Sequence, residues 1–98
     1  MSDVDVVDDE SASRFETVVD GHEAELVYRR EDGRLVLLHT GVPDELGGRG
    51  IGGALVMAAV DAAAARGLTV VPQCPFTRRW LERHPDDAAR VTIAWPAA

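Results

Sequence analysis

The sequence predicts a mixed α/β (α+β) domain, built from an antiparallel three-stranded meander, a helix, a parallel strand and a second helix. Two observations lead to this prediction. Apolar and polar residues alternate over residues 14–40, interrupted by turn-forming Asp-Gly pairs, and the alanine-rich stretch 52–66 has the composition of a helix. With 98 residues, of which 46% are hydrophobic, the chain can form one core, and we expect a single domain over residues 14–98.

The N-terminal residues 1–13 differ in composition from the rest of the chain. They combine five acidic residues with serines and few large apolar side chains. Such a segment buries too little apolar surface to offset the entropy lost on ordering, so we expect a disordered acidic tail. The tail lacks the pattern of a secretory signal, and the chain has a single cysteine. Both features predict a cytoplasmic protein without intramolecular disulfides.

Charge and hydropathy exclude several classes of partner. The formal net charge is −7, so the surface offers no general attraction for nucleic acid. No apolar run approaches the ~20 residues needed to cross a bilayer. All basic residues are arginines, which excludes a Schiff-base lysine and a P-loop lysine. The three histidines and one cysteine lack metal-ligand spacing, so we expect no metal. We expect a monomer or a weak homodimer.

Three strands are predicted before residue 41. The first covers residues 14–19 and ends at the turn pair Asp20-Gly21. The second contains the alternating apolar residues Ala24, Leu26 and Tyr28 and ends before Gly33. The third covers residues 35–40. Because its first four residues are apolar on both faces, we expect it to be buried inside the sheet.

The second half of the chain predicts helix, strand and helix. Strong helix formers extend from residue 52 to 66, and Gly67 is suited to a left-handed C-cap. Residues 68–72 form a short apolar strand, parallel to the third strand if the crossover is right-handed. A second helix follows over residues 75–84, with Pro85 ending it. Alternating apolar residues over 91–95 predict an edge strand.

The glycine run between the third strand and the first helix is the strongest functional signal. Five glycines lie between residues 47 and 53, and glycine allows positive φ and a close approach of several backbone N–H groups to one anion. The helix that follows adds its unpaired first-turn N–H groups and its positive dipole end. The spacing by itself is a weak signal, because similar glycine patterns occur in unrelated folds.

In its context this run resembles the acyl-coenzyme A site of the GNAT-type N-acetyltransferase superfamily. The family loop reads Gln/Arg-x-x-Gly-x-Gly/Ala. Gly50 and Gly52 match its two glycines, whereas Gly47 stands where Gln or Arg is expected. The strings 39–43, 72–76 and 84–85, together with the loop, look like the short N-acetyltransferase-like proteins of the YjdJ type. The resemblance covers about residues 15 to 90, and it implies a truncated GNAT-like acyl-CoA N-acyltransferase fold with acetyl-CoA as cosubstrate and no identified acceptor.

The resemblance also implies which residues bind the coenzyme. Backbone N–H groups of the glycine run would hold the pyrophosphate, with Arg49 adding charge, and the end of the third strand would lie beside the pantetheine arm. The alternative is a glycine-rich turn without a ligand. The predicted coenzyme-binding residues are Thr40, Val42, Gly48, Arg49, Gly50, Ile51, Gly52 and Gly53.

Two side chains are candidates for catalysis. Three roles are open for Cys74: a nucleophile that accepts the acyl group, a general acid that protonates the departing coenzyme thiolate, or a small buried apolar residue. His39 is a candidate base for the acceptor ammonium, since its ordinary pKa lies near 6.5; the alternative is a hydrogen-bonded strand residue.

Two functions follow from these residues. The first is an acetyl-CoA-dependent N-acetyltransferase that acts on an unidentified amine by direct transfer. The alternative is a coenzyme A or acetyl-CoA-binding module without catalytic turnover. GNAT enzymes commonly form the acceptor pocket with additional N-terminal helices, and we expect this short sequence to lack them. Both functions predict coenzyme binding, and only the first predicts amine-dependent release of free coenzyme A.

Overall fold

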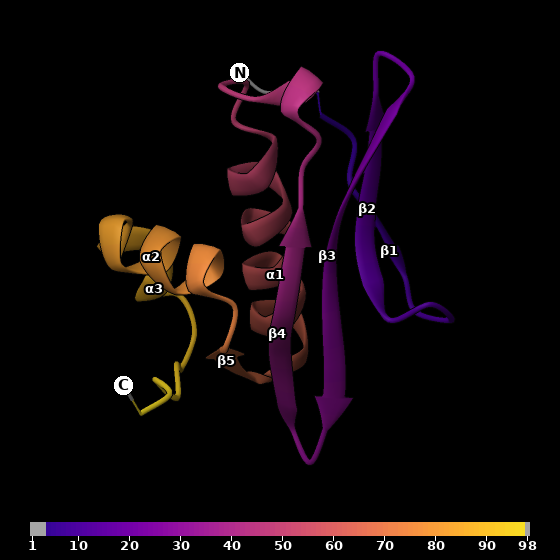
Figure 1. Cartoon of the computed structure of the whole chain (residues 1–98). Helices are drawn as coiled ribbons and strands as arrows, with labels where there is room; N and C mark the ends of the chain where they lie inside the picture. Colours follow the sequence, from indigo (N-terminus) through magenta and orange to yellow (C-terminus); the bar gives the residue numbers. More distant parts are fainter. Residues whose placement is uncertain (1–3, 98) are drawn as a thin grey trace.

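The computed structural model describes residues 4–97 and shows a five-stranded sheet with one long helix packed against it (Figure 1). The strands follow one another across the sheet in chain order. The core lies between the sheet and helix α1 and contains Phe15, Leu26, Leu37, Leu55 and Val56. The elements are β1 (Val7–Asp9), β2 (Arg14–Val19), β3 (His22–Glu31), β4 (Arg34–Gly41), the 3₁₀ turn η1 (Asp44–Leu46), α1 (Ile51–Arg66), β5 (Thr69–Pro72), α2 (Pro75–Arg83) and α3 (Pro85–Ala88).

The predicted antiparallel meander is confirmed as β2, β3 and β4. The two hairpins are joined by Asp20-Gly21 and Asp32-Gly33, and both residues of each pair have positive φ, between 49° and 78°. This is the conformation of the hairpin turns whose twist matches that of the flanking strands, and Asp-Gly favours it. β4 lies between β3 and β5, and its residues 35–37 are all buried.

Helix α1 and the parallel strand β5 are also confirmed. Gly50 and Gly67 flank the helix in the left-handed conformation, with φ of 74° and 66°. The Gly67 N–H donates to the carbonyl of Ala63, as expected of a glycine C-cap. β5 pairs with β4 in parallel register, Leu35 opposite Val70 and Leu37 opposite Pro72. The chain therefore leaves β4, crosses one face of the sheet as α1 and returns as the parallel strand β5 (Figure 1).

The C-terminal part is less regular than predicted. Pro85 ends α2 but also begins the short helix α3, because proline is tolerated in a first turn. The edge strand over residues 91–95 is reduced to a single bridge between Val70 and Ile93. Since β5 has only four residues and ends in a proline, it offers few backbone groups for a longer ladder.

The prediction of a disordered tail is wrong for residues 4–13; residues 1–3 lie outside the described residues. β1 pairs antiparallel with β2, and Val4 and Val6 pack against the core. The Thr17 hydroxyl donates to the carbonyl oxygen of Asp5 at 2.7 Å. The ordered domain therefore begins before residue 14, because the valines between the acidic residues reach apolar surface that the meander leaves open.

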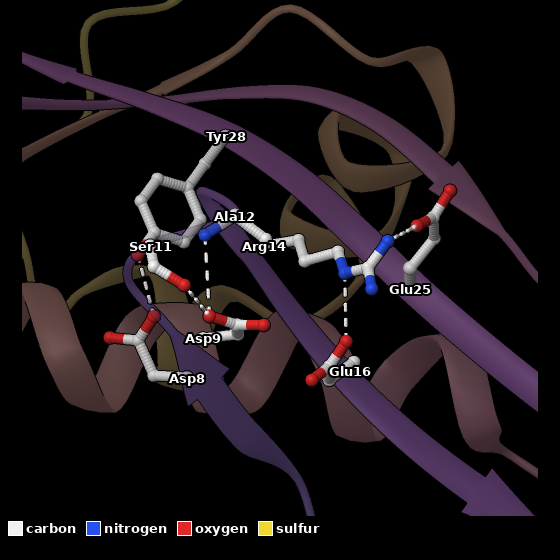
Figure 2. Close-up of polar contacts among 8 residues, drawn as sticks. All are labelled: Asp8, Asp9, Ser11, Ala12, Arg14, Glu16, Glu25 and Tyr28. Atoms are coloured by element: carbon white, nitrogen blue, oxygen red, sulfur yellow. Dashed lines mark hydrogen bonds and ion pairs between the residues drawn. The ribbon is translucent and has the colours of Figure 1, made fainter.

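Polar contacts also attach this segment to the sheet. The Tyr28 hydroxyl donates to Asp8 at 2.6 Å, and Asp9 accepts from the Ser11 hydroxyl and the Ala12 N–H (Figure 2). Burial, and then Asp8, raises the pKa of Tyr28 well above its ordinary value, so the phenol stays a donor. Glu10 pairs with Arg66 at the end of α1 at 3.1 Å.

We predict that Tyr28→Phe lowers the free energy of unfolding by about 1.5 kcal/mol, because it removes a hydrogen bond to a carboxylate. Urea unfolding measures this change. The control is Glu31→Gln, which breaks the exposed Arg29–Glu31 ion pair and should change stability by less than about 0.5 kcal/mol. Equal effects of the two substitutions would show that the Tyr28–Asp8 hydrogen bond does not help to hold β1 on the sheet.

Candidate functional site

Strands β4 and β5 separate beyond Leu37. The last paired residues are Leu37 and Pro72, after which the N–H groups of Gln73 and Cys74 both donate to the Leu37 carbonyl, at 3.0 and 2.9 Å. The chain then turns into α2, whereas β4 continues to Gly41 paired with β3. Beyond this point the backbone groups on the β5 side of residues 38–41 have no neighbouring strand within residues 4–97. We call the point where β4 and the chain that leads into α2 separate the fork.

A β-bulge lies at the same point. Tyr28 pairs with Leu37, but the preceding residue Val27 pairs with His39, so Leu38 is an extra residue in β4. A bulge bends the strand and changes which face the following side chains occupy. Without it, His39 would share the α1 face with Leu37. With it, Thr40 lies opposite Leu26 on the α1 face and His39 lies on the other face.

The fork brings Thr40 and Cys74 together. The Thr40 Oγ1 lies 3.5 Å from the Cys74 Sγ, although the two residues are 34 positions apart in the chain. Cys74 is 5% exposed and stands at the N-cap of α2, where the Thr77 hydroxyl donates to its carbonyl at 2.9 Å. Sequence reasoning assigned Thr40 to the coenzyme strand and missed that its hydroxyl contacts the thiol, because nothing in the local sequence reports this contact.

The surroundings of Cys74 favour the thiolate. Burial by itself raises the pKa of the thiol, but hydrogen bonds from the Thr40 hydroxyl and from the backbone at Thr77, Phe76 and Thr40 outweigh burial and hold the pKa below its ordinary value. Two of these backbone groups belong to the first turn of α2, whose dipole acts in the same direction. The acidic, lysine-free composition gave no sign of this support for a thiolate.

His39 does not join Cys74. Its side chain is exposed, and it lies with Glu25 on either side of Gly41: a Cβ on Gly41 would stand 3.5 Å from the His39 Nε2 and 3.7 Å from the Glu25 Cγ. The two catalytic candidates therefore occupy opposite faces of β4.

The face of the sheet that carries His39 also holds a cavity of about 460 Å³, lined by Arg14, Glu16, Glu23, Glu25, Gly41 and Pro43 among others. Arg14 pairs with Glu16 at 2.7 Å and with Glu25 at 3.3 Å (Figure 2). One guanidinium thus serves two carboxylates, and Glu23 adds a third. The cavity has an excess of negative charge beside the end of β4.

The glycine run divides into two parts with different roles. Gly48 and Gly50 have φ of 76° and 74°, and a Cβ on either would meet no atom within 4 Å. They hold Arg49 between them in an exposed loop directly before α1. The first helical hydrogen bond runs from the Ala54 N–H to the Gly50 carbonyl, so the preceding N–H groups are the unpaired donors of the helix start. The segment 48–50 and the unpaired N–H groups that follow it therefore have the geometry to bind an anion.

Gly52 and Gly53 are glycines because α2 packs against them. A Cβ on Gly52 would stand 2.6 Å from the Phe76 ring, and one on Gly53 would stand 2.7 Å from the Trp80 Nε1. Contact with α2 thus explains why these two positions have no side chain, while their backbone N–H groups, which lie in the first turn of α1, stay predicted donors to the pyrophosphate. Neither aromatic residue was linked to the glycines by the sequence pattern.

The remaining predicted coenzyme-binding residues are part of the framework. Ile51 is 2% exposed, and its side chain belongs to the core. Val42 is half-buried and packs against the core just after β4. Ile51 can therefore offer a ligand only its backbone groups, whereas Val42 also lines the cavity beside Gly41. Gly47 lies close to η1, where its N–H donates to the Asp44 carbonyl.

Comparison with known proteins identifies the family. A model of the GCN5-related N-acetyltransferases matches residues 14–91. The chain belongs to this family. The fold is similar to the NMR solution structure of a GCN5-like candidate N-acetyltransferase from Staphylococcus aureus, with 30% sequence identity and a TM-score of 0.71, over 99% of this chain and 94% of the other. The GNAT-like fold expected from the resemblance is confirmed, whereas the YjdJ-type branch stays a prediction.

Family membership makes this chain a candidate acyltransferase, and acetyl-CoA is the cosubstrate that GNAT proteins generally use. Within residues 4–97, no cluster of three or more His, Cys, Asp or Glu side chains could hold a metal ion. No helix in this described part of the chain has the length and apolar character to span a bilayer.

We predict that Thr40→Val raises the pKa of Cys74, because valine keeps the shape of threonine but removes the hydroxyl that favours the thiolate. The chemical shift of the Cys74 Cβ, followed by NMR over a pH titration, measures the midpoint. Thr92→Val, at an exposed position, is the control and should leave the midpoint unchanged. A midpoint that stays the same or falls in Thr40→Val would show that the hydroxyl does not stabilise the thiolate.

Proposed function

We propose that this protein is an acetyl-CoA-dependent N-acetyltransferase that transfers an acetyl group directly to an amine. The observation that supports this most strongly is the fork itself: a partly activated thiol, a strand with an unpaired edge and an open glycine loop follow one another around the point where β4 and β5 separate. An extended thioester with a diphosphate at its far end has the shape and chemistry for these three features.

The loop supports binding of the diphosphate. Gly48 and Gly50 leave open space, Arg49 carries a positive charge, and the start of α1 presents N–H groups and a positive dipole end. Backbone contacts of this kind do not depend on a side chain at position 47. The replacement of the usual Gln or Arg by Gly47 therefore removes one contact and leaves the main ones.

The end of β4 supports binding of the pantetheine arm. From His39 to Gly41 the backbone pairs with β3 on one side, its other side faces the fork, and Val42 continues this segment directly after β4. Extended backbone of this kind can hydrogen-bond an amide-rich chain as a neighbouring strand would. Thr40 and Val42 lie in this segment, so their backbone groups are the proposed contacts.

The residues at the fork then have distinct roles. His39 accepts a proton from the acceptor ammonium, and the neutral amine attacks the thioester carbonyl carbon. The carbon–sulfur bond breaks, and Cys74 donates its proton to the departing sulfur; the proton that the attacking nitrogen then loses passes through water to restore the Cys74 thiol, and His39 releases its own proton to solvent. The hydrogen bonds to Cys74 move its pKa from the ordinary thiol value toward neutral pH, which is the direction that favours a general acid.

The acceptor reaches the fork from the face opposite α1. His39 and the cavity beside Gly41 both lie on that face, and the cavity carries an excess of carboxylates. Such a lining attracts a cation and repels an acidic substrate. A positively charged amine is therefore the acceptor class that fits best.

One observation favours the alternative of coenzyme binding without turnover. Cys74 is 95% buried, and its thiol already contacts Thr40, so coenzyme could occupy the fork without the proton transfer described above. The two functions differ in whether an amine accelerates the release of free coenzyme A.

Acetyl-CoA should stabilise the protein. At a hundredfold excess over the dissociation constant, binding to the native state adds about 2.7 kcal/mol, which corresponds to a rise in Tm on the order of 10 °C. Gly50→Ala should abolish this rise, because its Cβ enters the open space of the loop. The matched control is Gly33→Ala, whose glycine has the same φ of 74° and equally open space but lies in the β3–β4 turn. No rise at millimolar acetyl-CoA in the parent protein would refute the proposed function.

Cys74→Ala should bind acetyl-CoA normally and lower amine-dependent turnover by ~10²- to 10⁴-fold, the range for loss of a general acid. Release of free thiol, followed with a chromogenic reagent, measures turnover. Intact-mass analysis of the parent protein after incubation with acetyl-CoA tests the direct route. An acetyl group retained on Cys74 and lost on adding amine would establish a covalent intermediate instead. Unchanged turnover in Cys74→Ala would exclude the thiol from the chemistry.

A further inference from the structure

Arg49, the cation of the glycine loop, already has an anionic partner within the protein. Its Nη1 lies 2.6 Å from the Oδ2 of Asp20, in the turn between β2 and β3, 29 positions earlier in the chain. Both side chains are exposed, Arg49 by 46% and Asp20 by 69%. The contact thus joins two loops at the surface and can open without disturbing the core.

The backbones on both sides fix where these side chains start. Arg49 is held between Gly48 and Gly50, which are both left-handed, and Asp20 has a φ of 51° in a tight hairpin turn. The Arg49 hydrogen bond, and then its charge, holds the pKa of Asp20 below its ordinary value, with His22 acting in the same direction. Asp20 is therefore ionised at neutral pH, and the pair is present under the conditions in which coenzyme binds.

We infer that Asp20 competes with the coenzyme phosphates for Arg49, and so sets the affinity of the loop for the coenzyme. This inference rests on the proposed function. A guanidinium can bind a carboxylate or a phosphate through the same donors, so the diphosphate must displace Asp20 before it gains the full contact with Arg49. Asp20 is a positioning residue in this scheme: it acts through Arg49 and touches no reacting atom.

The competition has a modest and definite size. Exposed ion pairs contribute little to stability, and losing one before binding corresponds to about a two- to five-fold weaker affinity. Weaker binding of the diphosphate raises the dissociation rate of the coenzyme A product. Asp20 therefore favours release over retention, which benefits an enzyme whose product differs from its cosubstrate by one acetyl group.

The test measures coenzyme A binding by calorimetry in a double-mutant cycle. Asp20→Asn should bind coenzyme A about two- to five-fold more tightly than the parent, because Arg49 is then available. In the Arg49→Gln background, Asp20→Asn should have no effect, since the competition requires the guanidinium. Asparagine tolerates the positive φ at position 20, so the turn is retained.

Asp32→Asn is the matched control. Asp32 precedes Gly33 in the β3–β4 turn with a φ of 49°, the counterpart of Asp20 before Gly21. This substitution should leave the affinity unchanged. Equal affinities of Asp20→Asn and the parent would overturn the inference, and so would an equal gain in the Arg49→Gln background, which would indicate general repulsion. Failure of the parent to bind coenzyme A at all would instead refute the proposed function, and the inference with it.

Discussion

The geometry of the site depends on one backbone acceptor, the carbonyl oxygen of Leu37. It receives the N–H groups of both Gln73 and Cys74, which ends the pairing of β5 with β4. Pro75 is suited to the first turn of a helix, so the chain leaves the sheet soon after Pro72. β4 continues alone, and the extra residue Leu38 bends it at the same point. The thiol, the free strand edge and the separation of the two faces all follow from this fork.

The glycine run shows how one sequence segment meets two physical demands. Gly48 and Gly50 supply left-handed backbone and open space, whereas Gly52 and Gly53 allow Phe76 and Trp80 to lie directly on the start of α1. The packing of Phe76 and Trp80 on Gly52 and Gly53 also serves the loop, because it positions α2, and with it Cys74, relative to Gly48 and Gly50. Loop and thiol are thus connected through the packing of α2 on the start of α1.

Ion pairs link distant segments of this acidic chain. Glu10 connects the N-terminal segment to Arg66 of α1, Arg14 joins β2 to Glu25 of β3, and Asp20 reaches Arg49. None of these pairs is deeply buried, so each contributes little stability by itself. Their main effect is on position and on local charge, which bears on substrate choice at the cavity and on coenzyme affinity at the loop.

Local patterns in the sequence determined the meander, the long helix, the parallel strand and the glycine loop, because alternation, turn pairs and helix formers act over a few residues. The position of Cys74 just after a buried strand was also readable. Tertiary structure decided the rest. β1 forms because distant partners, Thr17 and Tyr28, reach back to an acidic segment with weak propensity of its own. Thr40 meets Cys74 and His39 turns away from it because a single bulge shifts the register of β4, and a one-residue shift moves every later side chain to the other face.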